Sequence, residues 1–198
     1  MDNGSGRGCR NSGEMRILAL SGSLRAASIN SAFCRATARL APANVHVEVL
    51  SGLGNIPAFN QDLEPSPPSA VQSLRAAIHG ATALVIASPE YAHGVSGVMK
   101  NALDWLVSDE GTVGKPIAVV NTSGRAHHAY DALREVLTTM STDIVATASV
   151  TLPLLGTCTT EQEMVSSPHV SRAIRGMIEA LVLHVAGPSA PLVNFPIA

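Results

Sequence analysis

Short apolar runs alternate with amphipathic segments along most of the chain. Five runs have the length and residue types of strands, and they cover 16–20, 45–50, 83–87, 117–121 and 144–150. Five other segments carry apolar residues three and four positions apart, which predicts helices over 30–40, 70–79, 97–107, 128–140 and 168–185. Alternating strands and helices favour parallel strands joined by right-handed crossovers. We therefore expect an α/β fold, a doubly wound sheet with helices on both faces.

Local patterns refine this expectation. In 45–50, valines alternate with polar residues, which indicates one more exposed face and a position near a sheet edge. The continuous apolar run 83–87 indicates a fully buried parallel strand. At the helix ends, Gly80 and Gly187 are stop signals, and Ser96 has the side chain of an N-cap.

The chain is predicted to form one folded unit. Residues 1–14 are rich in Gly, Ser, Asn and charged residues and cannot build a core, so we expect a disordered leader. A long loop rich in Gly and Pro is expected over 51–69. With no repeat or internal linker, the prediction is one domain over 15–187 and a C-terminal tail over 188–198.

Composition narrows the class of protein. Of the 198 residues, 46% are apolar and 14% are charged, and a chain of this length buries roughly 70% of its extended surface. The net charge of -2 and the lack of a basic stripe argue against a nucleic-acid partner. The apolar runs are far shorter than the roughly 18 residues that span a bilayer. Residues 1–14 also lack the apolar core of a signal peptide, so we expect a cytoplasmic protein with no membrane partner.

The cysteines and histidines indicate neither a disulfide framework nor a metal site. Cys9, Cys34 and Cys158 have no metal-binding spacing, and their odd number argues against pairing. We expect free thiols in a reducing compartment. The neighbours His127 and His128 point in different directions, which makes a poor metal pair.

The loop 21–30 joins the first predicted strand to the first predicted helix. In doubly wound sheets, ligands bind outside the carboxyl ends of the strands, and unpaired N–H groups at a helix N-terminus favour an anion. Ser23, Ser28 and Asn30 add neutral donors, and a planar cation comes from Arg25. The loop thus has the groups to cradle a phosphate monoester, although it matches neither the Walker pattern nor the dinucleotide glycine pattern. The alternative is a polar loop in which Ser28 only caps the helix.

The segment 88–97 follows the third predicted strand at the same sheet edge. Pro89 stiffens the exit from the strand, and Gly94 and Gly97 let a flat ligand approach the backbone closely. Tyr91 can present its ring to a conjugated system. The alternative is a surface loop with a capping serine.

Three motifs now occur in order at the expected strand exits. They are Gly-Ser-x-Arg-x-x-Ser-x-Asn at 22–30, Pro-Glu-Tyr at 89–91 and Lys-Asn-Ala-Leu-Asp-Trp at 100–105. With them the chain resembles the NAD(P)H-dependent FMN reductase family, which includes quinone, azo-dye and chromate reductases. The similarity runs from about 15 to 151 and includes 57–64. It implies a flavodoxin-like FMN-binding domain over 15–187, with a five-stranded parallel sheet of order 2-1-3-4-5.

The resemblance also implies roles for particular residues. The FMN phosphate is expected against Ser23, Arg25, Ser28, Ile29 and Asn30. The isoalloxazine and ribityl chain are expected beside Pro89, Glu90, Tyr91, Ala92 and His93. The far edge of the ring is expected near Ser123, Gly124 and Arg125. A homodimer or homotetramer is implied, with the cleft completed by a neighbouring subunit.

The implied activity is electron transfer from NADPH or NADH through FMN to a quinone-like or other small-molecule acceptor. Because the cofactor carries the chemistry, no catalytic residue is required from the protein. Glu90 has the chemistry of a base, but a structural role is the favoured interpretation.

The chain departs from the family pattern at three places. Ala92 stands where the family usually has Asn, and Ser96-Gly97 replaces Pro-Gly. Losing the amide is expected to cost about 1 kcal/mol, or about fivefold in flavin affinity. Arg125 lies in a loop that is usually glycine-rich, and it either narrows the cleft or meets a phosphate of the nicotinamide nucleotide.

Three alternatives stay open. A hydrolase needs Gly-x-Ser-x-Gly, and in 94–98 the fifth residue is Val98. A non-catalytic flavin-binding sensor or electron carrier would keep the FMN site without turnover. A third possibility is a protein that has lost flavin.

Overall fold

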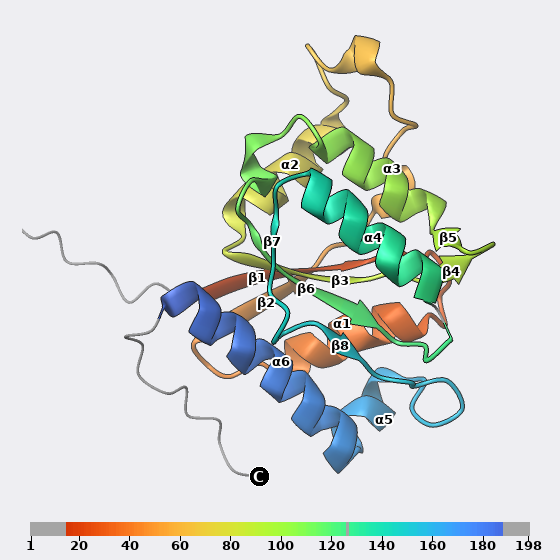
Figure 1. The fold of residues 1–198 in the computed structure, drawn as a ribbon, viewed down its shortest axis with the longest axis vertical. Coiled ribbons are helices and arrows are strands. Elements are labelled where there is room, and N and C mark those ends of the chain that lie inside the picture. The colour runs from red at the N-terminus through yellow and green to blue at the C-terminus, as the bar shows by residue number, and fades with distance from the viewer. Residues whose placement is uncertain (1–14, 126, 188–198) are drawn as a thin grey trace, which may run out of the picture.

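The computed structural model describes residues 15–125 and 127–187. Figure 1 shows a central sheet between two layers of helices. Its strands are β1 (Met15–Ser21), β2 (Val45–Val49), β3 (Ala83–Ala87), β6 (Pro116–Asn121), β7 (Asp143–Ile144) and β8 (Val150–Thr151). All pair in parallel in the order β2-β1-β3-β6-β7, and β8 also pairs with β6. The flavodoxin-like class and the order 2-1-3-4-5 are confirmed.

Each face of the sheet has its own hydrophobic core. One face is covered by α2 (Ser69–Gly80), α3 (Gly97–Leu106) and α4 (His127–Thr139), and the other by α1 (Ile29–Leu40), α5 (Glu161–Ser166) and α6 (Pro168–Ala186) (Figure 1). Because strand side chains alternate, Ile17 belongs to the core under α1 and α6, whereas Leu18 belongs to the core under α2, α3 and α4. Two cores explain why the inner strands, unlike β2 at the sheet edge, are apolar without alternation.

The prediction of one continuous fifth strand over 144–150 is wrong, because the structure has two short strands there, β7 and β8. A turn separates β7 from β8, and in it the N–H and hydroxyl of Ser149 both donate to the carbonyl oxygen of Val145 at 3.0 Å. The Ser149 hydroxyl oxygen also accepts the N–H of Val119 at 3.1 Å, beside β6. At this point the hydroxyl of Ser149 accepts the hydrogen bond that a backbone carbonyl of a neighbouring strand would otherwise accept. The pattern of apolar residues carries no sign of such a replacement.

The segment after β3 is a hairpin, which we did not predict. It pairs β4 (Glu90–Tyr91) with β5 (Gly94–Val95) in antiparallel fashion. Its two turn residues, Ala92 and His93, have φ angles of 50° and 60°. Positive φ at both central residues is the geometry of a type I′ hairpin turn, and non-glycine residues hold it with strain.

The helix boundaries agree with the prediction to within one residue, except that α5 was missed. The Ser96 hydroxyl oxygen accepts the N–H of Met99 at 3.4 Å, which confirms it as the N-cap of α3. Gly187, with φ of 73°, ends α6 as expected. The α5 helix starts at a capping box formed by Thr160 and Glu163. The predicted leader over 1–14 and tail over 188–198 lie outside the described residues.

The long loop 51–69 is attached to α3. It contains the short helical turns η1 (Leu53–Asn55) and η2 (Gln61–Leu63). The carbonyl oxygen of Pro57 accepts from Trp105 Nε1 at 2.8 Å and from Asn101 Nδ2 at 3.0 Å. The Trp105 ring is fully buried and meets Phe59 edge-on, with centroids 5.1 Å apart. These bonds give the motif 100–105 a structural role.

The described cysteines, Cys34 and Cys158, form no disulfide. Burial raises the pKa of the Cys34 thiol to about 12, which makes it unreactive at neutral pH, and Cys158 is half-buried. Cys9 falls outside the described residues. Within 15–125 and 127–187, no cluster of three His, Cys, Asp or Glu residues has the geometry for a metal ion. No described helix is long and apolar enough to cross a membrane.

Candidate functional site: a cleft at the carboxyl ends of the strands

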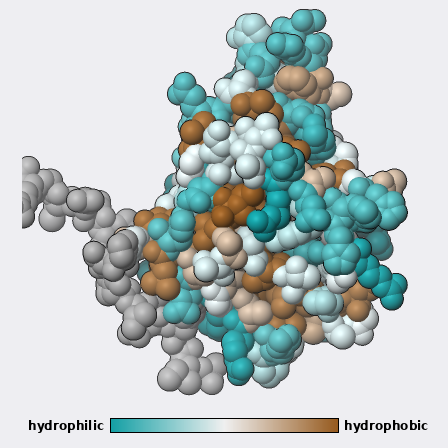
Figure 2. Space-filling model, in the orientation of Figure 1, coloured by the Kyte–Doolittle hydropathy of each residue, from teal (hydrophilic) through white to brown (hydrophobic). Residues whose placement is uncertain are grey.

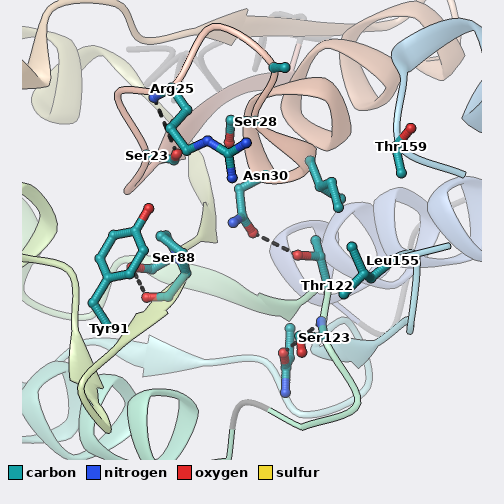
Figure 3. Close-up of a pocket in the computed structure, with 14 residues that line it drawn as sticks. Ser23, Arg25, Ser28, Asn30, Ser88, Tyr91, Thr122, Ser123, Leu155 and Thr159 are labelled. Atoms are coloured by element: carbon teal, nitrogen blue, oxygen red, sulfur yellow. Dashed lines mark hydrogen bonds between the residues drawn. The ribbon is translucent and has the colours of Figure 1, made fainter.

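A cleft of about 320 Å³ opens at the carboxyl ends of β1, β3 and β6 (Figure 3). The chain turns opposite ways from β1 and β3 in a sheet of this order, so the cleft lies at the topological switch point. Its volume is at the lower end of the range for ligand pockets. The lining residues are Ser23, Arg25, Ala27, Ser28, Ile29, Asn30, Ser88, Pro89, Tyr91, Asn121, Thr122, Ser123, Leu155 and Thr159.

The cleft brings together most of the residues expected at the flavin. Eight line it, namely Ser23, Arg25, Ser28, Ile29, Asn30, Pro89, Tyr91 and Ser123. The other five, which are Glu90, Ala92, His93, Gly124 and Arg125, belong to the same loops but do not line the cleft. The loops after β1, β3 and β6 therefore converge as expected, whereas their side chains divide between the cleft and the packing around it.

The first loop presents donors at one end of the cleft. Ser28 caps α1, since its hydroxyl oxygen accepts the N–H of Ser31 at 3.2 Å. In the described part of the chain, the N–H groups of Ile29 and Asn30 donate to no protein acceptor, as is usual in the first turn of a helix. The Arg25 side chain reaches toward Ser28 and Asn30 (Figure 3). Helix dipole, free N–H groups and one guanidinium all favour an anion here.

The Asn30 amide is oriented by a residue from another strand exit. The Thr122 hydroxyl, just after β6, donates to Asn30 Oδ1 at 2.9 Å (Figure 3). Both residues are buried. Because Oδ1 is occupied, the Nδ2 hydrogens are left to donate elsewhere, and Asn30 lines the cleft. Thr122 thus sets the direction in which Asn30 donates.

The loops after β1 and β3 touch at Gly22. The Gly22 N–H donates to the Ala87 carbonyl oxygen at 2.9 Å. A Cβ at Gly22 would lie 2.4 Å from Ser88 Oγ and 2.7 Å from Ser96 Oγ, so any side chain would displace both serines. This close approach holds Ser88 and Tyr91 across from the first loop, on the far side of the opening from Leu155 and Thr159 (Figure 3).

Glu90 faces α4 and not the cleft. Its Oε2 accepts the N–H of Ala129, in the first turn of α4, at 2.9 Å, and its Oε1 lies 3.3 Å from His93 Nδ1. The Ala129 N–H holds the pKa of the Glu90 carboxyl below its ordinary value. The His93 ring packs edge-on against His128, with centroids 4.4 Å apart. Glu90 therefore joins the hairpin to a helix terminus, where a carboxylate is favourable.

The residues of the loop after β6 also face in two directions, some toward the cleft and some away from it. Ser123 lines the cleft, and its hydroxyl oxygen accepts the Arg125 N–H at 3.3 Å. Arg125 itself is exposed and outside the lining. A Cβ at Gly124 would lie 3.3 Å from Pro153 Cγ, so Gly124 serves close packing against the segment after β8. In this structure Arg125 does not narrow the cleft.

Six residues that line the cleft were not predicted from the sequence. They are Ala27, Ser88, Asn121, Thr122, Leu155 and Thr159. Ser88, Asn121 and Thr122 stand at the ends of predicted strands, so the rule that ligands lie beyond carboxyl ends was enough to find them. Leu155 and Thr159 come from the segment between β8 and α5, which has no periodicity that would signal a site.

The donor set of the cleft fits FMN. No described lining residue is acidic, and the lining offers one cation, six serine and threonine hydroxyls, and two amides. These groups can bind a phosphate monoester and a polyol, which are the two polar parts of FMN. Ile29, Pro89 and Leu155 add apolar surface, and Tyr91 adds a ring for a flat conjugated system.

Comparison with known proteins agrees with this fit. The sequence profile described as NADPH-dependent FMN reductase matches residues 15–154. A quinone reductase of Escherichia coli K12 is 34% identical over 132 residues, which is 63% of this chain and 70% of that protein. An NAD(P)H-dependent FMN reductase of Pseudomonas aeruginosa is 37% identical over 115 residues, or 57% of this chain and 62% of that protein.

The fold has counterparts among solved structures. A flavoenzyme NAD(P)H:(acceptor) oxidoreductase from Paracoccus denitrificans superposes with a TM-score of 0.66, covering 85% of this chain and 95% of that one. At 22% identity this likeness concerns the fold alone. The sequence matches go further, because the profile covers most of the chain and the loops after β1, β3 and β6 that line the cleft. The chain belongs to the NADPH-dependent FMN reductase family and is an FMN-dependent oxidoreductase.

Proposed function

We propose that this protein binds FMN in the cleft at the switch point and passes electrons from NADPH or NADH through it to a quinone-like acceptor. The observation that carries the proposal is the cleft itself, with an acid-free phosphate cradle at one end and Tyr91 along one side. The similar Escherichia coli protein is a quinone reductase, which supports a quinone as the acceptor class.

The residues of the first loop would bind the FMN phosphate. Arg25 supplies the charge, Ser28 and Asn30 supply side-chain donors, and the N–H groups of the first turn of α1 supply the rest. Thr122 would hold Asn30 in its donating orientation. No acidic side chain of the described lining repels the phosphate.

The loops after β3 and β6 would hold the rest of the cofactor. Pro89 and Tyr91 line one side of the opening, and Ser123 lines the lower end in Figure 3. When bound, FMN supplies the redox chemistry, and the protein supplies orientation and an open side for the two substrates in turn. Tyr91 is half exposed, with 53% of its surface accessible, so its ring can meet a planar substrate as well as the cofactor.

The residues outside the lining would act indirectly. Glu90 and His93 would hold the hairpin against α4, so that Tyr91 keeps its place. Ala92 lies at the exposed turn of this hairpin. We therefore expect Ala92 to cost little flavin affinity, less than the fivefold expected for a lost hydrogen bond to the ring.

The test is a spectrum of the flavin-loaded protein. The chain is loaded with excess FMN, desalted, and titrated with NADPH and then NADH without oxygen. Retained flavin bands that bleach, and that return when benzoquinone is added, are the expected result. Retained bands that neither nucleotide bleaches would instead identify a sensor or an electron carrier. Loss of all flavin on desalting would reject the site.

We further propose a cytoplasmic homodimer or homotetramer. Apolar residues reach the surface between α4 and α6, beside the short edge strand β7 (Figure 2). Such surface is typical of protein contacts. Light scattering on the purified chain distinguishes an oligomer from a monomer, and a monomer at micromolar concentration would reject this part of the proposal.

A further inference from the structure

A second hollow lies directly beyond the phosphate end of the cleft. It has a volume of about 400 Å³ and is lined by the loop 26–28, by one side of α1 and by the segment 159–162. Ala27, Ser28 and Thr159 line both this hollow and the cleft. Ser28 and Thr159 stand on opposite sides of the upper end of the cleft in Figure 3. The two spaces therefore adjoin at the place proposed for the FMN phosphate, with these three residues between them.

The side of α1 that borders this hollow carries two arginines. Ala32, Arg35 and Arg39 share one face of the helix, since they are three and seven positions apart. From Ser28 to Arg39 the helix rises by roughly 16 Å, at about 1.5 Å per residue. Ala32 leaves room between the loop and the first arginine. The hollow is thus an elongated groove that leads away from the phosphate.

The two guanidinium groups face one carboxylate. Arg35 Nε lies 3.0 Å from Glu161 Oε2, and Arg39 Nη1 lies 3.3 Å from Glu161 Oε1. Arg39 Nη1 also donates to the Gln162 side-chain oxygen at 3.0 Å. Two cations against one anion leave an excess of positive charge in the groove. Each guanidinium has five N–H donors, and within the described residues most of them remain available.

We propose that this groove binds the ADP half of FAD, so that the protein accepts FAD as well as FMN. The inference rests on the proposed function, because that places the flavin phosphate at the mouth of the groove. A second phosphate attached there would meet Arg35, exchanging part of its contact with Glu161 for a charge-assisted bond. The adenosine would follow α1 toward Arg39, whose planar guanidinium can stack on a base.

The chemistry of the groove favours a nucleotide over a purely apolar ligand. Its lining combines two cations, hydroxyl side chains from Ser28 and the 159–160 segment, and small alanines. Ser28 and Thr159 lie between it and a site for a phosphate monoester. A pyrophosphate is the bridge that such a junction accommodates. The ion pairs with Glu161 are partly exposed, so exchanging them costs little.

The test compares the affinities of the flavin-free protein for FMN and FAD by quenching of flavin fluorescence. We expect FAD to bind about tenfold more tightly than FMN, because a charge-assisted bond to Arg35 and a stacking contact with Arg39 are added. Arg39→Ala should remove much of this advantage of FAD and leave FMN binding within twofold. Arg172→Ala, which removes the same charge from an exposed position on α6, is the matched control and should change neither. Circular dichroism establishes that each variant is folded.

Each other outcome has a definite meaning. If FMN binds and FAD binds no more tightly, the groove proposal is wrong and the proposed function stands. If Arg39→Ala weakens the binding of FMN and FAD equally, Arg39 acts on the fold and the proposal is again wrong. If it instead weakens NADPH binding to the FMN-loaded protein and spares FAD, the groove serves the nicotinamide nucleotide. If neither flavin binds, both proposals fail together.

Discussion

Replacing Thr122 with valine tests whether a residue outside every recognised motif controls the flavin site. Valine keeps the branched shape of threonine and removes only the hydroxyl that donates to Asn30 Oδ1 at 2.9 Å. Thr122 is 7% exposed and Asn30 is 6% exposed, so water does not readily replace that donor. No buried side-chain nitrogen or oxygen of the described residues lacks a hydrogen-bond partner, and the substitution would create one that does.

Two effects of different origin follow from Thr122→Val. An unsatisfied buried acceptor costs about 1–3 kcal/mol, so the free energy of unfolding of the flavin-free protein should fall by that amount. The Asn30 amide also loses its fixed orientation, and weakening one hydrogen bond to the FMN phosphate by about 1 kcal/mol should lower the affinity about fivefold. Urea unfolding measures the first effect, and quenching of FMN fluorescence measures the second.

Thr122→Ser is the matched control for this substitution. Serine keeps the hydroxyl and loses only a methyl group, so FMN affinity should stay within twofold of the original protein. The reasoning is refuted if the valine variant binds FMN as tightly as the original protein. It is equally refuted if the serine variant loses as much affinity as the valine variant, since the hydroxyl would then not be the cause.

Three further substitutions test the supports of the cleft. Gly22→Ala should destabilise the fold by about 1–3 kcal/mol, because the new Cβ meets Ser88 Oγ at 2.4 Å, and adding Ser88→Gly should restore part of that loss in urea unfolding. Trp105→Phe should cost about 1–2 kcal/mol in the same assay through the lost bond to Pro57, with FMN affinity unchanged; weaker FMN binding would contradict the structural role. Glu90→Gln should destabilise the protein at pH 7. The folded-state pKa of Glu90 is lowered, chiefly by the Ala129 N–H, so its stabilising effect is complete above the ordinary value of 4.5 and is lost as pH falls through the lowered value. Thermal unfolding of the original protein and the variant should therefore converge at acid pH, and a gap that stays constant would count against this.

Much of the fold was predictable from local patterns. Helix α1 illustrates this, since its apolar spacing, its Ser28 cap and its position after a strand are all visible within 28–40. The turn between β7 and β8 illustrates the limit. It depends on a bond from the Val119 N–H to the Ser149 hydroxyl, two residues from different strands. No pattern within either segment signals that bond.

The candidate site divides in the same way. The first loop was predictable because Arg25, Ser28 and Asn30 stand between a strand and a helix, where phosphate cradles form. The direction of Glu90 was not, because its carboxylate is held by the N–H of Ala129, 39 residues away. A residue in a loop takes its direction from whichever neighbour bonds to it, and loop periodicity carries no information about that neighbour.

The amino-acid sequence by itself determined the alternation of strands and helices, the parallel sheet and the loop that bears the anion-binding groups. These follow from hydrophobic period, helix caps and residue chemistry, which act over a few residues. Only the tertiary structure decided that Thr122 orients Asn30, that Leu155 and Thr159 line the cleft, and that a second hollow along α1 to Arg39 adjoins the cleft. Those features arise where segments distant in the chain meet, and there packing and hydrogen-bond satisfaction choose the partners.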